Sequence, residues 1–173
     1  MEKYIPDIYQ KSIYEINYKK LQQCGIKCLL FDIDNTLVPL NCKEPTDKLK
    51  EFIDNLKSQN FKVILYSKSG KNKMVPFKEG LNIDCCSLKG KLFDKKIKSI
   101  LESYNYKQAE VAIIGDKMNY DILNGNKVGI TTILINPISN KDHLVEKIGR
   151  YKEKKLMKKL RNNNLFVKGR YYG

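Results

Sequence analysis

The stretch that decides the fold is KCLLFDIDNTLV, residues 27–38. Its apolar run at 28–31 is typical of a strand that is covered on both faces. The run ends at Asp32 and Asp34, and two such close carboxylates resist ionising together unless a cation or a proton offsets them. Ligand sites of open α/β sheets lie outside the carboxyl ends of strands. The stretch therefore predicts a metal-assisted acid site at the end of a buried strand.

Outward from this stretch, apolar runs alternate with amphipathic segments. Leu49, Phe52, Ile53 and Leu56 have the spacing of one helix face, and Thr46 is in the position of its N-cap. Within residues 1–23, Ile13, Ile16 and Leu21 are expected to form one side of a short helix that packs on the sheet, and a membrane-surface role for this segment is the alternative. Further strands are predicted at 61–66, 81–86, 111–114 and 130–135, with helices at 71–80, from 92 to 101, and between Asp121 and Gly129.

This alternation predicts a Rossmann-like α/β sandwich of three layers, with a five-stranded, mainly parallel sheet and right-handed crossovers. We see no internal repeat and no low-complexity linker, so residues 1–173 are expected to form one domain. Within it, residues from about 141 to 173 are predicted to be a basic C-terminal helix and tail.

Polar side chains follow three of the predicted strands. Asp32 and Asp34 end the first strand, Ser67 ends the second, and Asp116 ends the fourth. The carboxyl ends of parallel strands meet at one edge of a sheet, so we expect these groups to converge. Asp121 follows at the start of the next helix. Ser67 and its small neighbours could offer a hydroxyl and N–H groups to an anion, and an ordinary turn is the alternative reading.

The composition sets limits on location and chemistry. No apolar run reaches the roughly 18 residues of a membrane span, and the first ten residues lack the core of a signal peptide, so we expect a cytoplasmic protein. The five cysteines are an odd number, which favours reduced, structural thiols. With His143 as the single histidine, zinc sites and Ser–His or Cys–His catalysis are disfavoured.

The charge is strongly positive and unevenly spread. The formal net charge is +14, and residues 141–173 hold 11 Lys or Arg against 3 Asp or Glu. Such a field attracts nucleic acid, an acidic membrane surface or a phosphorylated substrate. A lysine-rich composition that reflects genomic base bias is the alternative.

At this point the motifs resemble those of a known superfamily. DIDNT at 32–36 resembles the DxDxT motif of the haloacid dehalogenase (HAD) phosphatases, Ser67 resembles their second motif, and GDKMNYD at 115–121 resembles their fourth. More closely, FDIDNTLV at 31–38 and residues 114–137 are similar to the YqeG family of class IIIA HAD phosphatases, which has relatives that act on phosphatidylglycerophosphate. The similarity runs from about Ile5 to the basic C-terminal segment.

The third motif departs from the family pattern. The family places a lysine six residues before a helical aromatic, and counting back from Phe93 gives Ser87. Lys89 and Lys91 lie nearby, and Lys89 is the expected substitute, with Lys91 left open. If neither lysine reached the phosphate, activity would be low or lost.

The resemblance implies a Mg²⁺-dependent, two-step phosphoryl transfer. Asp32 would be the nucleophile and a metal ligand, and Asp34 would carry the proton and bind the metal through its backbone carbonyl. Thr36 would anchor the turn, and Asp121 would act through water or from just outside the ligand set. Asp116 would complete the metal site, and the expected phosphate-binding residues are Ser67, Lys68 and Lys89.

Chain length between the motifs restricts the substrate. The 32 residues between Asp34 and Ser67 leave no room for a cap domain, so we expect a phosphate displayed on something large, or a second subunit that covers the site. The favoured substrate is a lipid such as phosphatidylglycerophosphate at the inner face of an anionic membrane. An RNA- or ribosome-binding protein with little catalysis and a nucleic-acid end phosphatase are the alternatives. The oligomeric state stays open.

Overall fold

The computed structural model describes residues 1–68, 71–88, 93–139 and 144–167. Its centre is a sheet of six parallel strands in the order β1-β6-β5-β2-β3-β4. The strands are β1 (Ile8–Gln10), β2 (Cys28–Asp32), β3 (Lys62–Ser67), β4 (Asp84–Ser87), β5 (Val111–Gly115) and β6 (Thr131–Ile135).

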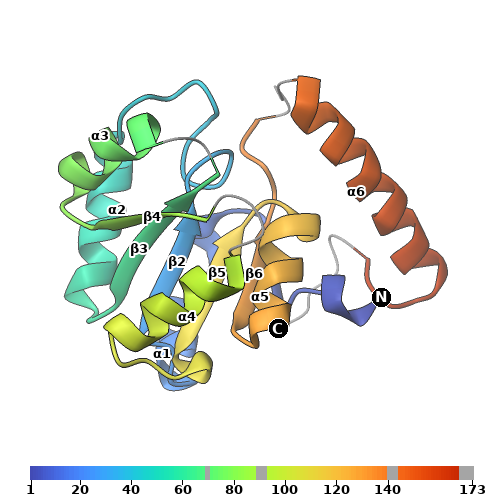
Figure 1. Ribbon diagram of the computed structural model, residues 1–173, viewed down its shortest axis with the longest axis horizontal. Helices are drawn as coiled ribbons and strands as arrows, with labels where there is room; N and C mark the ends of the chain where they lie inside the picture. Colours follow the sequence, from blue (N-terminus) through green and yellow to red (C-terminus); the bar gives the residue numbers. More distant parts are fainter. Residues whose placement is uncertain (69–70, 89–92, 140–143, 168–173) are drawn as a thin grey trace.

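Helices surround this sheet on both faces and on one side (Figure 1). The α-helices are α1 (Tyr18–Gln23), α2 (Asp47–Ser58), α3 (Lys71–Leu81), α4 (Phe93–Ser103), α5 (Leu123–Val128) and α6 (Leu144–Asn162). Short turns of other helix types are η1 (Glu2–Tyr4), η2 (Ile13–Glu15), η4 (Gln108–Glu110) and η5 (Met118–Ile122), the last of which is a π-helix.

The three-layer α/β architecture is confirmed, but the prediction of five strands was wrong. The additional strand is β1, which pairs with β6 at the edge of the sheet. It lies in the N-terminal segment of residues 1–23, for which only a short helix was predicted. A strand of three residues carries too little alternation to be recognised, and its identity comes from its pairing with a strand more than a hundred residues away.

The core has two main apolar clusters because side chains of a buried strand alternate between the two faces. On one face, Leu29 and Phe31 of β2 pack with residues of α1, α2 and α3. On the other, Cys28 and Leu30 pack with residues of α4. This explains why residues 28–31 form a continuous apolar run, and every one of them is fully buried.

Local signals for helix ends agree with the structure. The Thr46 side chain accepts a hydrogen bond from the N–H of Leu49 at 3.3 Å, so it caps α2 as predicted. At the end of α5, Gly129 has a φ of 80°, the left-handed conformation that glycine adopts without strain.

The C-terminal helix α6 lies at the opposite side of the molecule from α2 and α3 (Figure 1). A third apolar cluster anchors it, in which Leu160 and Phe166 are fully buried against Tyr9, Met118 and Leu134. None of the helices in the described ranges has both the length and the apolar character that crossing a membrane requires.

Candidate active site

The topology of the sheet puts the motifs together. Strand β2 lies between β3 and β5, and the chain reaches these two neighbours by crossovers on opposite sides of β2. Ligands of open α/β sheets bind where the strand order reverses in this way. Asp32 ends β2, Ser67 ends β3, and Asp116 directly follows β5. The structure therefore brings these three predicted residues to one edge.

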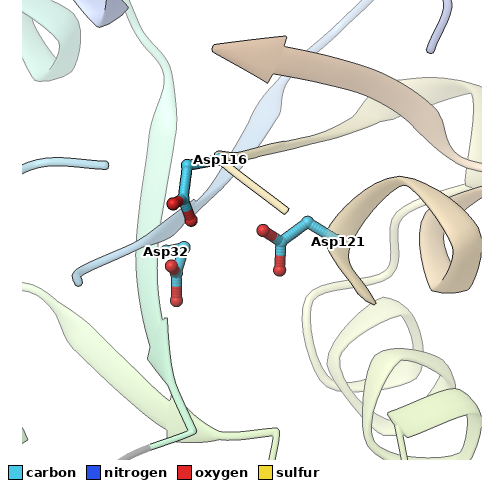
Figure 2. Close-up of side chains that lie close together, drawn as sticks. All are labelled: Asp32, Asp116 and Asp121. Atoms are coloured by element: carbon cyan, nitrogen blue, oxygen red, sulfur yellow. The ribbon is translucent and has the colours of Figure 1, made fainter. Parts of the chain in front are cut away.

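Three buried carboxylates form the centre of the site. Oxygen atoms of Asp32, Asp116 and Asp121 all lie within 4.8 Å of one another. Figure 2 shows the three side chains close together, with those of Asp116 and Asp121 directed toward Asp32. Asp121, which was expected to act from outside the ligand set, thus lies in the same group as Asp32 and Asp116.

One glycine permits the approach of Asp121. A Cβ atom added to Gly115 would lie 2.7 Å from Cβ of Asp121, so a larger residue there would displace the carboxylate. The turn η5 then fixes Asp121, whose Oδ2 accepts a hydrogen bond from the main-chain N–H of Lys117 at 2.9 Å. The glycine of the GDKMNYD motif is therefore required for packing at this point, since it leaves room for the third carboxylate.

Electrostatics make this cluster costly without a cation. Burial raises the pKa of Asp32 well above its usual range, the neighbouring carboxylates of Asp121 and Asp116 raise it further, and Lys68 and Lys117 oppose the rise. Burial also raises the pKa of Asp116, and Asp121 adds to that increase. Asp32 and Asp116 each resist ionising because the charge of the carboxylate would be buried beside like charges.

The same cluster fits a divalent metal ion. Within the described part of the chain, Asp32 Oδ2, Asp116 Oδ1 and Asp121 Oδ1 are buried and have no hydrogen-bond partner. Buried polar atoms without partners are rare and call for an explanation such as an ion. Hard cations take carboxylate oxygens as ligands, so the donor set present here matches such an ion.

Asp34 is not part of the group of three carboxylates, and its side chain contacts other residues. Its Oδ1 forms an ion pair with Lys73 of α3, and its Oδ2 lies 3.5 Å from the hydroxyl of Ser67. Lys73 also donates to the main-chain oxygen of Leu40 at 2.8 Å, so it ties the loop after β2 to α3. Lys73 was not among the predicted site residues.

The turn after β2 directs Asp34 back toward the site. Asn35 has a φ of 63°, a conformation that asparagine tolerates better than most residues, and its N–H donates to the oxygen of Val38 at 2.8 Å. The N–H of Leu37 donates to the oxygen of Ile33 at 3.1 Å. Backbone hydrogen bonds thus close this turn, and Thr36, the predicted anchor, is buried within it.

Of the two lysines that were predicted to bind phosphate, Lys68 belongs to the described residues and Lys89 does not. The Lys68 ammonium lies 3.6 Å from Asp121 Oδ1 and 3.9 Å from the centre of the Tyr120 ring, so it is held beside the cluster. Lys89, like its alternative Lys91, lies outside the described residues. No role for either follows from the structure.

Helix α6 also contributes to the site, which the sequence did not reveal. Its Arg150 contacts the Asp116 carboxylate, and its Glu153 accepts a hydrogen bond from the N–H of Met118. One signal was present in the sequence, because Glu153 is the only acidic residue between positions 149 and 162. An acidic residue that is alone in a basic helix is a candidate for a structural contact.

Comparisons with known proteins show which proteins this chain is similar to. Residues 89–161 match the family model of HAD-hydrolase-like proteins. The chain is 28% identical over 158 residues to a Bacillus subtilis protein named "Probable phosphatase YqeG", an alignment that covers 91% of this chain and 92% of the relative.

Solved structures show the same fold at low sequence identity. A protein from Xanthomonas campestris has a TM-score of 0.55 with 13% identity, covering 74% of this chain and 75% of that one. A cobalt-bound deoxy-D-mannose-octulosonate 8-phosphate phosphatase from Haemophilus influenzae has a TM-score of 0.50 with 16% identity, covering 68% of this chain and 81% of that one.

Proposed function

We propose that this chain is a HAD-like hydrolase, and more closely a Mg²⁺-dependent phosphatase that uses Asp32 as its nucleophile. The observation that carries the proposal is the group of three buried carboxylates at the switch point of the sheet, each of which has an oxygen without a hydrogen-bond partner among the described residues. A set of only oxygen donors favours Mg²⁺ over metals that prefer nitrogen or sulfur ligands.

The metal would be held by Asp32, Asp116 and the backbone carbonyl of Asp34, and the position of Asp121 suits direct or water-mediated ligation. When bound, the ion would offset the charge of the buried carboxylates and of the substrate phosphate, which lowers the barrier to attack by an anion. Lys68 adds a positive charge beside the cluster, where it would contact a phosphate oxygen.

The chain's own residues then divide the reaction into two steps. In the first, a carboxylate oxygen of Asp32 forms a bond to phosphorus, the bond from phosphorus to the ester oxygen breaks, and Asp34 gives its proton to the departing oxygen. In the second, Asp34 takes a proton from water, the water oxygen forms a bond to phosphorus, and the bond from phosphorus to the Asp32 oxygen breaks, which releases inorganic phosphate and the free Asp32 carboxylate. Ser67 and Lys73 hold the Asp34 side chain in place for both proton transfers.

Two features support a large, membrane-displayed substrate. Residues 33–46 connect β2 to α2 without any inserted domain, so no cap is built on this connection. Beside the site, the outer face of α6 exposes a basic surface formed by Lys152, Lys154, Lys155, Lys158, Lys159 and Arg161, with Tyr151 among them at 71% exposure.

This basic surface of α6 suits an anionic bilayer. Each basic residue near such a surface contributes about 1 kcal/mol of attraction, and an exposed tyrosine can enter the headgroup region. Arg150 of the same helix is largely buried and contacts Asp116, so a membrane bound to α6 would lie beside the catalytic carboxylates. We therefore propose a phospholipid monoester such as phosphatidylglycerophosphate as the substrate.

The proposal is tested by phosphate release from phosphatidylglycerophosphate in mixed micelles and from a small soluble phosphate ester. We expect Mg²⁺-dependent turnover that is higher on the lipid and is lost in Asp32→Asn. Equal turnover by the wild type and Asp32→Asn would refute the role of Asp32. Turnover on the lipid no better than on the soluble ester would refute the substrate.

A second candidate function rests on the same basic surface, because a phosphate backbone is also attracted to it. In this case the protein would bind RNA with little catalysis or act on nucleic-acid ends. Salt-sensitive RNA binding without measurable phosphatase activity would favour the binding function. Higher turnover on phosphorylated oligonucleotides than on lipid would favour the end phosphatase. The buried carboxylate cluster argues against a pure binding role, since binding alone has no need of it.

A further inference from the structure

The contact between α6 and the loop after β5 is built from two residues one turn apart. Arg150 and Glu153 lie on the same face of α6, as residues three positions apart do, and their side chains form an ion pair at 3.2 Å. Both side chains are largely buried, with 15% and 13% exposure. They face the active site rather than solvent, unlike the basic residues on the outer face of the helix.

The Arg150 guanidinium makes three contacts through two separate nitrogen atoms. One nitrogen, Nη2, contacts Oδ2 of Asp116. The other, Nη1, donates to the main-chain oxygen of Asp116 and to Glu153 Oε2, each at 3.2 Å. This planar fork is specific to arginine, which the chain uses only three times among 33 basic residues.

Glu153 completes the connection on the other side of Asp116. Its Oε1 accepts a hydrogen bond from the main-chain N–H of Met118, while Oε2 holds Arg150. The two residues of α6 thus bind the main chain both at Asp116 and two residues later. Met118 itself belongs to the apolar cluster that anchors the end of the helix.

The contact with Arg150 leaves only one carboxylate oxygen of Asp116, Oδ1, available to a further partner. Because Arg150 occupies Oδ2, rotation of the carboxylate is restricted and Oδ1 is the oxygen left for another partner. Oδ1 has no hydrogen-bond partner among the described residues, and the Asp116 carboxylate is directed toward Asp32 (Figure 2). Lys117 approaches Oδ1 only to 3.9 Å.

We propose that Arg150, supported by Glu153, is a positioning residue that orients Asp116 for metal binding and couples the docking of α6 to occupancy of the metal site. This inference rests on the proposed function, in which Asp116 is a metal ligand. Partners that orient metal ligands typically contribute 10- to 100-fold to metal affinity. By thermodynamic reciprocity, metal binding must strengthen the docking of α6 by the same factor.

The test is Mg²⁺ affinity measured by isothermal titration calorimetry, without substrate, on full-length wild type, Arg150→Ala, Arg150→Lys and Arg161→Ala. Arg161 is the matched control because it is an exposed arginine in the last turn of the same helix. We expect Arg150→Ala to weaken binding by about 10-fold or more, Arg150→Lys to give an intermediate loss, and Arg161→Ala to bind as the wild type does.

A second readout is hydrogen exchange of the α6 amides with and without Mg²⁺. Added Mg²⁺ should slow exchange in the wild type and in Arg161→Ala, and it should do so less in Arg150→Ala. Circular dichroism establishes that each variant is folded, and if Arg150→Ala is not, the comparison rests on Arg150→Lys.

Two results would overturn the inference while leaving the proposed function intact. One is wild-type affinity in both Arg150 variants. The other is tighter binding in either of them, which would mean that Arg150 competes with the ion. Failure of the wild type to bind Mg²⁺ would instead refute the metal site on which the proposed function depends.

Discussion

Replacing Asp32 by asparagine should stabilise the metal-free protein, although it should abolish activity. The substitution keeps the shape of the side chain and removes one negative charge from the buried cluster. Oxygens of Asp116 and Asp121 lie within 4.8 Å of those of Asp32. When it folds without metal, the wild type must either hold these like charges together or bind protons that neutralise them. The variant has one charge fewer in the cluster, so this cost is smaller.

The magnitude follows from Coulomb's law. At 4.8 Å, two unit charges repel by about 3.5 kcal/mol if the effective dielectric constant is about 20. Asp32 has two such neighbours, while Lys68 and Lys117 offset part of the repulsion. We expect a net gain of about 2 kcal/mol, which corresponds to a rise in Tm of roughly 4–8 °C for a chain of this size.

The gain should depend on pH. The pKa of Asp32 is raised in the folded state, so between its ordinary value and the raised value the folded protein binds more protons than the unfolded protein does. Stability of the metal-free wild type therefore falls as pH rises through this interval. The stability advantage of Asp32→Asn over the wild type should be small in acid, where Asp32 of the wild type is protonated in both the folded and the unfolded protein. It should grow toward neutral pH.

The assay is thermal and urea-induced unfolding in EDTA, followed by the same measurement in Mg²⁺. The control is Asp54→Asn, because Asp54 is 72% exposed on α2 and its replacement should change stability by less than about 0.5 kcal/mol. Mg²⁺ should raise the Tm of the wild type more than that of Asp32→Asn. Metal-free Asp32→Asn with a Tm equal to or below that of the wild type would refute the electrostatic reasoning.

Three further substitutions test separate parts of the account. Lys73→Ala removes the ion pair that holds Asp34, and steady-state kinetics should show kcat reduced by about 10-fold or more with a smaller change in KM; an unchanged kcat would count against this role. Gly115→Ala would push Asp121 out of the cluster, so calorimetry should show weaker Mg²⁺ binding, and wild-type affinity would contradict the packing argument. Lys155→Glu changes the α6 surface by two charges, so vesicle sedimentation should show binding to anionic lipid weakened by about 30-fold at low salt, and undiminished binding would exclude this surface.

The sequence predicted the central strands well because they carry their own signal. A strand covered on both faces needs apolar residues at every position, and 28–31 and 111–114 show this directly. Strand β1 was missed because its three residues include Gln10, and only pairing with β6 makes it a strand. Short edge strands depend on long-range contacts that no local pattern contains.

Some residues of the candidate site could also be predicted from the sequence, whereas others depend on long-range packing. Asp32 and Asp116 could be placed from the ends of their strands, because parallel strands end at a common edge. The position of Asp121 depends on the close approach to Gly115 and on the turn η5, which spacing alone does not define. Lys73 and Arg150 reach their carboxylates from distant segments, so only the packing of α3 and α6 reveals them.

Chemical trapping of the phosphorylated residue tests directly whether Asp32 is the nucleophile. Wild-type protein is mixed with substrate and Mg²⁺, quenched during turnover and treated with borohydride, which reduces an aspartyl-phosphate to homoserine. Peptide mass spectrometry should then find homoserine at position 32, and only when substrate and Mg²⁺ are both present. Turnover with unmodified Asp32, or trapping at a different residue, would contradict the assignment of Asp32 as the nucleophile.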